Sequence, residues 1–295
     1  AIRTNPHIDH VWTVDAASGL LGLLKLRKKF KAKQVDLVLD LHNNFRSRVL
    51  RKLGAPVRTL KKLKLNRFLL VKFKINRYPR IIPVHQRYID TAAEFGIEDD
   101  GNGLEFYIDA EAQKTVDERL QSELKTGRPI IGIAPGAGFA TKRWLPEYFA
   151  HTARVLQQEN RAQIWLFGNQ DDRAITDMIA GHVNAPVNLA GELPLMQTAA
   201  ALNHIDLLLT NDTGLMHLAT ALKKPTVAVF GPTVQELGFF PVGENASVME
   251  HPNLSCRPCT HMGRHQCPQE HFKCMREVTP EQVLQAVQRF RLKKT

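Results

Sequence analysis

An acid, a hydroxyl and a glycine stand together where a buried strand is expected to turn into a helix. The apolar run at 205–210 is followed by Asn211, Asp212, Thr213 and Gly214, and His217 comes shortly afterwards. Asp212 can cap the helix, and the Thr213 and Gly214 amides can bind a phosphate, which approaches closely because glycine has no Cβ. A helix cap that binds no ligand explains these residue types as well. The corner is therefore a candidate phosphate site.

A second corner carries glycines and a cation. The expected strand at 130–134 leaves through Pro135, Gly136, Ala137 and Gly138, and Lys142 precedes the next helix. Backbone amides of such a loop can hold diphosphate oxygens while the ammonium neutralises their charge. The spacing matches neither the Walker loop nor the Gly-x-Gly-x-x-Gly dinucleotide fingerprint. The neighbouring Trp144 is explained equally well by packing.

A third strand end carries two acids. Gly168 closes the expected strand, and Asp171 and Asp172 follow within a short loop. Carboxylates at this place can accept hydrogen bonds from ribose hydroxyls. Acids at the start of a helix are also favoured by the helix dipole, so the pattern leaves both interpretations open.

The elements that position these corners alternate along the second part of the chain. Near-continuous apolar strands separated by helices of about ten residues indicate a parallel sheet that is covered on both faces. The expected strands begin at Arg128, Ala162, Ile205 and Pro225, and the expected helices lie at 146–159, 172–182, 193–204, 214–224 and 280–294.

The first part of the chain also alternates. Strands are expected at 10–14 and 35–42, and helices at 20–34, 43–54 and 84–96, the last two closed by Gly54 and Gly96. An acidic, weakly periodic stretch at 97–112 is the expected linker. We therefore expect two domains, residues 1–110 and 111–295.

The positive charge of the protein is concentrated in the first domain. Residues 1–100 hold 21 Lys and Arg against 9 Asp and Glu, a net +12, whereas the remainder has 19 against 20, a net −1. Such a field attracts nucleic acid, an anionic membrane surface or a phosphorylated glycolipid, although a basic face can also serve solubility alone. No apolar run is long enough to span a bilayer and no leader opens the chain, so we expect a cytoplasmic protein.

Every cysteine of the chain lies between residues 256 and 274. Such clustering in a cytoplasmic protein favours a structural Zn or Fe site over disulfides. The expected ligands are Cys256, Cys259, Cys267 and Cys274. Reduced thiols or one disulfide pair are the alternatives.

Taken in order, the motifs resemble glycosyltransferase family 9, the bacterial ADP-heptose:lipopolysaccharide heptosyltransferases. The resemblance rests on PGAGFATKRW, LFGNQDD, NLAG, NDTGLMHLATAL and VFGPT in the second domain. The first domain resembles the family more loosely, through VDLVLDLHNNFRSRVL and HQRYIDTAAEFG. The resemblance implies an α/β protein of GT-B fold, in which two Rossmann-like doubly wound domains face a cleft.

The family likeness also implies a reaction and a set of site residues. Heptose would move from ADP-heptose to a lipopolysaccharide inner-core acceptor with inversion, and no cofactor would take part in catalysis. Lys142 and the amides of Thr213 and Gly214 would stabilise the departing diphosphate, and Asp212 would contact the donor sugar or hold the loop. The implied catalytic residues are Lys142 and Asp212, the donor-binding residues are Gly136, Gly138, Asp172, Leu193, Thr213, Gly214 and His217, and the acceptor-binding residues are Asn44, Arg46 and His85.

Two further expectations concern the first domain. The anionic glycolipid acceptor would lie at the inner membrane surface, so the protein would be peripheral to that membrane, and basic residues such as Arg48, Lys61, Lys62 and Lys64 would steer toward it. The family's leading strand and helix, together with a loop whose Asp is thought to be the catalytic base, have no counterpart before Asn5. We expect an incomplete first domain that binds ADP-sugar but transfers poorly.

Other functions remain compatible with the sequence. A transferase could use a UDP- or GDP-sugar, or act on a protein acceptor. A basic domain followed by a Cys-rich segment is also compatible with a nucleic-acid-binding protein. Against that reading, the basic segment lacks the interleaved aromatic residues that stack on bases.

Overall fold

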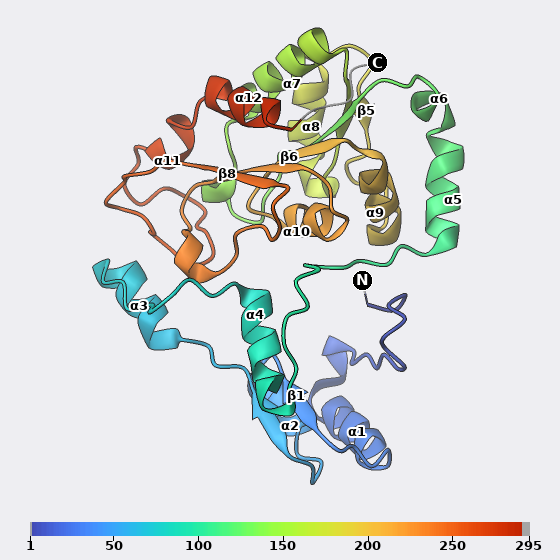
Figure 1. The fold of residues 1–295 in the computed structure, drawn as a ribbon, viewed down its shortest axis with the longest axis vertical. Coiled ribbons are helices and arrows are strands. Elements are labelled where there is room, and N and C mark those ends of the chain that lie inside the picture. The colour runs from blue at the N-terminus through green and yellow to red at the C-terminus, as the bar shows by residue number, and fades with distance from the viewer. Residues whose placement is uncertain (1, 291–295) are drawn as a thin grey trace.

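The computed structural model describes residues 2–290, which form two lobes joined by an extended segment (Figure 1). The first lobe runs to the end of a helical segment at Phe95, and the second begins at helix α5 (Ala110–Arg119). Helix α5 packs against helix α9 (Leu195–His204), so it belongs to the second lobe. Residues 96–109 contain no helix or strand, whereas residues 110–112 of the predicted linker belong to α5.

The first lobe has a small parallel sheet with helices around it. Strands β1 and β2 pair in parallel, with Val38 opposite Val57 and Asp40 opposite Thr59. Its strands are β1 (Val38–Asp40) and β2 (Val57–Thr59), and its α-helices are α1 (Gly19–Lys31), α2 (Phe45–Leu50), α3 (Lys64–Phe73) and α4 (Val84–Ile89), with 3-10 helices at Ala16–Ser18 and Asp90–Phe95. Strand β2 and helix α3 were not expected from the sequence.

The predicted strand at 10–14 is wrong, because these residues pair with no other strand. The ring of Trp12 instead packs edge-on against Phe30 of α1, with ring centroids 5.2 Å apart. The apolar pattern of this stretch therefore reflects contact with a helix rather than a place in a sheet. Strand β1 is confirmed but is shorter than predicted, and Leu39 within it is exposed.

The second lobe alternates strands and helices. The four predicted strands and five predicted helices are present, and the described residues hold two strands and three α-helices that were not expected, namely those at 187–188, 246–250, 110–119, 121–124 and 273–276. Its strands are β3 (Ile130–Ala134), β4 (Gln163–Leu166), β5 (Val187–Asn188), β6 (Leu207–Asn211), β7 (Thr226–Phe230) and β8 (Ala246–Glu250). Its helices besides α5 and α9 are α6 (Gln121–Leu124), α7 (Pro146–Asn160), α8 (Arg173–Ala180), α10 (Gly214–Ala221), α11 (Lys273–Arg276) and α12 (Pro280–Gln288). Thr279 caps α12 through a capping box, and Pro280 occupies the first helical position. Residues 291–294 of the predicted last helix lie outside the described part of the chain.

All strands of this sheet are parallel, in the order β5-β4-β3-β6-β7-β8. The chain moves outward from β3 in one direction, then returns to the other side of β3 and moves outward again. The connections therefore diverge between β3 and β6, and a crevice opens at the carboxyl ends of these two strands. The sequence motifs that follow β3 and β6 meet at this point.

Apolar side chains cover both faces of the sheet. Along β3, Ile131 and Ile133 face one core cluster, while Ile130 and Ala134 face the other. The first cluster is completed by α7, α8 and α12, and the second by α5, α9 and α10. Burial on both faces explains why the strands read as continuous apolar runs.

The two lobes touch through backbone and side-chain hydrogen bonds. The Val84 amide donates to the Gly238 carbonyl at 2.9 Å, and Arg87 donates to the Glu236 carbonyl at 3.2 Å. Lys74, which ends α3, donates to the Cys256 and Pro258 carbonyls at 3.0 and 2.5 Å. Within the described part of the chain, no helix combines the length and the apolar character that a membrane span requires.

Candidate functional site

A cavity of about 880 Å³ opens at the carboxyl ends of β3, β4 and β6. Its wall includes residues from the loops that follow each of these strands, as the parallel topology requires. Each of the predicted donor-binding residues lines it, namely Gly136, Gly138, Asp172, Leu193, Thr213, Gly214 and His217. The structure thus brings together positions that lie up to 81 residues apart in sequence (217 − 136).

Helix α10 points its first turn at this cavity. Thr213 is the N-cap, and its hydroxyl accepts a hydrogen bond from the Met216 amide at 3.4 Å. The preceding amides of a first helical turn have no intrahelical partner and carry the positive end of the helix dipole. A Cβ added to Gly214 would have no protein atom within 4 Å, so the Gly214 backbone faces open space. This corner can accept an anion at close range.

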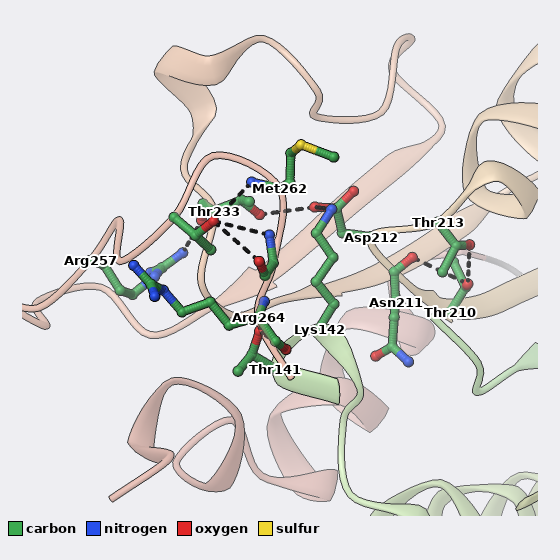
Figure 2. Close-up of polar contacts among 12 residues, drawn as sticks. Thr141, Lys142, Thr210, Asn211, Asp212, Thr213, Thr233, Arg257, Met262 and Arg264 are labelled. Carbon is green, nitrogen blue, oxygen red and sulfur yellow. Dashed lines mark hydrogen bonds and ion pairs between the residues drawn. The ribbon is translucent and has the colours of Figure 1, made fainter. Parts of the chain in front are cut away.

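Lys142 and Asp212 form an ion pair beside the cavity. The Lys142 ammonium lies 2.7 Å from the Asp212 carboxylate, and both side chains are largely buried. Figure 2 shows that the same carboxylate also accepts a hydrogen bond from the Thr233 hydroxyl, at 2.9 Å. Neither Lys142 nor Asp212 belongs to the cavity wall, whereas the adjacent Arg143 and Thr213 do. The pair therefore borders the cavity from within the protein.

Asn211 ties the loop between β3 and α7 to the end of β6. This fully buried side chain accepts a hydrogen bond from the Trp144 amide at 3.0 Å and donates one to the Pro135 carbonyl at 2.7 Å. Pro135 follows β3, Trp144 precedes α7, and Asn211 ends β6. Trp144 itself is fully buried and donates from its indole to the Val278 carbonyl, so it is a packing residue.

The Cys-rich segment supports the ion pair from behind. Thr141 donates from its amide and hydroxyl to the Arg264 carbonyl, at 3.1 and 3.0 Å, and its hydroxyl accepts from the Arg264 amide at 2.8 Å. Arg257 donates to the Thr233 carbonyl at 2.8 Å. These contacts hold the residues next to Lys142 and Asp212 in place.

Both members of the ion pair affect the pKa of His217. Burial lowers the pKa of His217 below its ordinary value, the Asp212 carboxylate raises it, and the Lys142 ammonium lowers it. The net direction is downward, so the imidazole is neutral near pH 7. A neutral imidazole on the cavity wall can donate or accept one hydrogen bond at each ring nitrogen.

Asp172 serves the protein structure at the place where the sequence suggested a ribose contact. Its carboxylate accepts from the Asn169 amide at 3.1 Å and completes a capping box. A Cβ at Gly136 would lie 2.2 Å from the same carboxylate, and one at Gly168 would lie 2.7 Å from its Cβ. The two glycines are thus required by close packing against Asp172. The more exposed Asp171 also lines the cavity.

The cavity wall includes residues that the sequence motifs did not assign. Arg143 places a cation on the wall itself and donates to the Ala137 carbonyl at 2.9 Å. Phe106 comes from the linker, and Gln170 and Thr198 come from the loop after β4 and from α9. The signal for Arg143 was its place beside Lys142, and that for Phe106 was the aromatic pair Phe106-Tyr107 in an otherwise acidic linker.

The predicted acceptor-binding residues lie in the first lobe, away from the cavity wall. Asn44 caps α2 through a capping box with Ser47. Arg46 is exposed on α2. His85 on α4 lies 3.8 Å from Asp99. The structure gives Asn44 a local role and leaves the acceptor assignment of these residues a prediction.

The predicted metal site is not supported. The Cys256 thiol lies 3.8 Å from the ring of His271. Burial raises the pKa of Cys259, and it raises the pKa of Cys274 to about 12. Among residues 2–290, no three His, Cys, Asp or Glu side chains converge as a metal site requires. The predicted cluster of four thiolate ligands is therefore not formed.

Comparison with known proteins assigns the chain to a family. The family described as "Glycosyltransferase family 9 (heptosyltransferase)" matches residues 23–270. The chain is 34% identical over 170 residues to a lipooligosaccharide heptosyltransferase 2 of Campylobacter jejuni, which covers 56% of this chain and 52% of the relative. It is 39% identical over 119 residues to lipopolysaccharide heptosyltransferase 2 of Escherichia coli K12, covering 38% and 34%. The match thus spans about half the length of the first of these relatives and about a third of the second.

Solved structures share the fold. The crystal structure of the glycosyl transferase family 9 from Veillonella parvula matches with a TM-score of 0.79 at 25% identity, over 98% of this chain and 84% of that chain. The E. coli ADP-heptose lps heptosyltransferase II matches with a TM-score of 0.64 at 24% identity, over 91% and 80%. The predicted α/β fold with parallel sheets, of GT-B type, is confirmed. The site geometry, the family match and the shared fold agree, and the chain belongs to glycosyltransferase family 9 (heptosyltransferase).

Proposed function

We propose that this protein transfers heptose, with inversion, from ADP-heptose to a lipopolysaccharide inner-core acceptor at a membrane surface. The observation that carries the proposal is the meeting of the Lys142 region and the first turn of α10 at one cavity. A nucleoside diphosphate needs such a meeting of cation and free amides. The names of the relatives supply the sugar and the acceptor.

The cavity suits the two ends of an ADP-sugar differently. Leu193, Leu195 and Phe106 make one part of its wall apolar, as an adenine ring requires. Thr213, Gly214 and Arg143 lie on the part formed by the β3 and β6 loops, where the diphosphate would bind. The proposed donor therefore runs from α9 to the N-terminus of α10.

Displacement at the anomeric carbon leaves negative charge on the departing ADP. The Thr213 and Gly214 amides and the Lys142 ammonium would stabilise that charge in place of water. Asp212 holds Lys142 at 2.7 Å, so the cation is positioned before the donor binds. Asp212 would orient the donor sugar through its remaining accepting capacity, since Lys142 and Thr233 occupy one oxygen.

Calorimetry with ADP and UDP tests the nucleotide site. We expect ADP to bind more tightly than UDP, and Lys142→Gln to weaken ADP binding about 10- to 100-fold through loss of a charge-assisted contact. Lys125→Gln is the matched control, because Lys125 is an exposed lysine of the same lobe at the end of α6, and not in the loops that follow β3 and β6. Equal affinities for ADP and UDP, or an unchanged affinity in Lys142→Gln, would contradict the proposed site.

Transfer itself requires a separate assay with ADP-heptose and a heptose-acceptor lipopolysaccharide. Removal of one donor that stabilises a developing charge lowers turnover by about 10²- to 10³-fold in other enzymes. We expect a loss of this order for Lys142→Gln, relative to the unsubstituted chain. Transfer that proceeds equally well in both proteins would exclude a role of Lys142 in the chemical step.

A further inference from the structure

The first lobe contains a long stretch of chain without acidic residues. Residues 41–89 hold fourteen Lys and Arg and no Asp or Glu. The basic residues are Arg46, Arg48, Arg51, Lys52, Arg58, Lys61, Lys62, Lys64, Arg67, Lys72, Lys74, Arg77, Arg80 and Arg87. Two of them pair with acids outside the stretch, Arg51 with Asp40 and Arg58 with Glu94. The excess positive charge of the others attracts an extended anionic partner.

Helix α3, in the middle of this stretch, exposes large apolar side chains. Leu65, Phe68 and Phe73 are 67%, 55% and 56% exposed. The rings of Phe68 and Phe73 pack against each other at 79°, with centroids 5.7 Å apart. They therefore form one apolar projection, not a pair of parallel plates on which bases could stack. Exposed apolar residues grouped in this way usually mark an interaction surface.

Lysines share the exposed face of α3 with these apolar residues. Lys64, Leu65, Phe68 and Lys72 follow helical spacing and all are exposed, while Leu70 on the opposite side is buried. Lysine side chains in such places extend their ammonium groups toward lipid headgroups while their methylenes lie along apolar surface. The combination of Phe and Leu with flanking Lys is typical of helices that lie in a membrane interface.

The orientation of α3 relative to the cavity-bearing lobe is fixed. Lys74, at its C-terminal end, donates to the Cys256 and Pro258 carbonyls. Figure 1 shows α3 at the edge of the first lobe, beside the loops of the second lobe that connect β8 to α11. Docking of this face would therefore hold both lobes at a set angle to a surface.

We propose that α3, through Leu65, Phe68, Phe73 and the flanking Lys61, Lys64 and Lys72, docks the protein on an anionic lipid bilayer. The acidic headgroups complement the acid-free stretch, and the acyl boundary accepts the apolar projection. This inference rests on the proposed function only in that a lipid-linked acceptor would lie on the same surface.

Vesicle sedimentation tests the docking face on the intact chain. We expect binding to vesicles of phosphatidylethanolamine with about 30% phosphatidylglycerol and little binding to pure phosphatidylcholine, with the affinity falling as salt is raised. Lys61→Gln, Lys64→Gln and Lys72→Gln together should weaken binding by tenfold or more, since each lysine near an anionic surface contributes on the order of a factor of five. Phe68→Ser alone should weaken binding several-fold at unchanged charge.

Matched controls distinguish a specific effect of α3 from a general effect of positive charge or exposed apolar surface. Phe95→Ser removes a ring that is 47% exposed elsewhere in the first lobe, and Lys114→Gln, Lys125→Gln and Arg128→Gln remove the same charge from the second lobe. Both control proteins should sediment as the unsubstituted chain does. Circular dichroism and ADP calorimetry on each variant report folding and the nucleotide site independently of lipid.

Three outcomes would overturn the docking proposal. One is equal binding to anionic and neutral vesicles, and another is unchanged vesicle binding in the α3 variants. The third is displacement of the protein from vesicles by single-stranded RNA with an affinity that Phe68→Ser does not alter, which would assign the basic stretch to nucleic acid. If the unsubstituted chain binds vesicles but does not bind ADP, the proposed function is refuted and the docking proposal is not affected.

Discussion

The two lobes differ in what holds them together. The core clusters of the second lobe fill both faces of its sheet with fully buried side chains. Among residues 2–109, the buried hydrophobic side chains are Leu23, Leu26, Leu70 and Ala92. The first lobe relies more on polar contacts, such as those of the buried Asp40 and the ion pair between Arg58 and Glu94.

This difference matches the two tasks that we assign to the lobes. A diphosphate site needs donors held to within a fraction of an ångström, and a densely packed sheet provides such a frame. Attraction of a large anionic surface needs charge over a wide area but little positional accuracy. The proposed diphosphate site therefore lies on the lobe with the large core, and the proposed docking surface lies on the lobe with the excess positive charge.

Truncation of a core leucine in each lobe should break this comparison most directly. Leu209→Ala in β6 removes a fully buried side chain and should cost about 3–5 kcal/mol of the free energy of unfolding. Leu26→Ala in α1, at 8% exposure, should cost about 1–2 kcal/mol because its surroundings can collapse or admit water. Urea denaturation, followed by tryptophan fluorescence, measures both. Equal costs would show that the lobes are equally well packed.

Asp40 should matter more to the first lobe than any of its apolar side chains. Burial raises the pKa of Asp40. Hydrogen bonds from the Asn43 amide, the Ser47 hydroxyl and the His42 amide, together with the charge of Arg51, lower the pKa by more than burial raises it, so the net shift is downward. A lowered pKa in the folded state means that stability is present above the ordinary value of 3.8 and is lost as pH falls through the folded pKa.

Asp40→Asn should therefore cost about 2 kcal/mol near pH 7. It should also remove this acid-dependent loss of stability. Hydrogen exchange of the His42 and Asn43 amides gives the local effect, and Asp36→Asn, in the same lobe, is the control. Amide protection that is unchanged in Asp40→Asn would refute the role of Asp40 as the polar centre of the lobe.

Two glycines of the site should respond in opposite ways to the same substitution. Gly214→Ala meets no protein atom within 4 Å and should fold normally, yet it should weaken ADP binding about tenfold, since the added methyl occupies the space proposed for phosphate. Gly136→Ala meets the Asp172 carboxylate at 2.2 Å and should lower the unfolding free energy by about 1–3 kcal/mol. Thermal unfolding measures the stability of both variants, and calorimetry measures their affinity for ADP. ADP affinity that is unaffected by Gly214→Ala would move the diphosphate away from α10.

The smallest expected effect is on the pKa of His217, which lies on the cavity wall of the second lobe. Since Asp212 raises the pKa of His217 and Lys142 lowers it, Asp212→Asn should shift the His217 pKa further down and Lys142→Gln should shift it up, each by about one unit or less. NMR titration, with the His217 resonance assigned through His217→Gln, measures both. Because the folded pKa of His217 lies below the ordinary value of 6.5, the contribution of His217 to stability is present above pH 6.5 and is lost as pH falls through the folded pKa. Shifts of the same sign in both variants would contradict the geometry.

Much of the second lobe could be predicted from the sequence because its signals are local. Continuous apolar runs mark β3, β6 and β7, and Thr279 with Pro280 marks the start of α12. The first lobe was predicted less well. The stretch at 10–14 has the pattern of a strand but covers α1, and α3 was missed because Leu65, Phe68 and Phe73 are exposed, contrary to the pattern of a core-facing helix.

The sequence by itself determined which residue types stand at each strand end, and hence that glycines, a lysine and a helix N-terminus follow β3 and β6. It could not show that Lys142 and Asp212 pair at 2.7 Å, that Asn211 ties the loop after β3 to β6, or that Asp172 is occupied with capping. Nor could it show that the four cysteines fail to converge as a metal site among the described residues. Strand order and the directions of side chains are set by long-range packing of the whole sheet, and no local stretch of sequence contains that information.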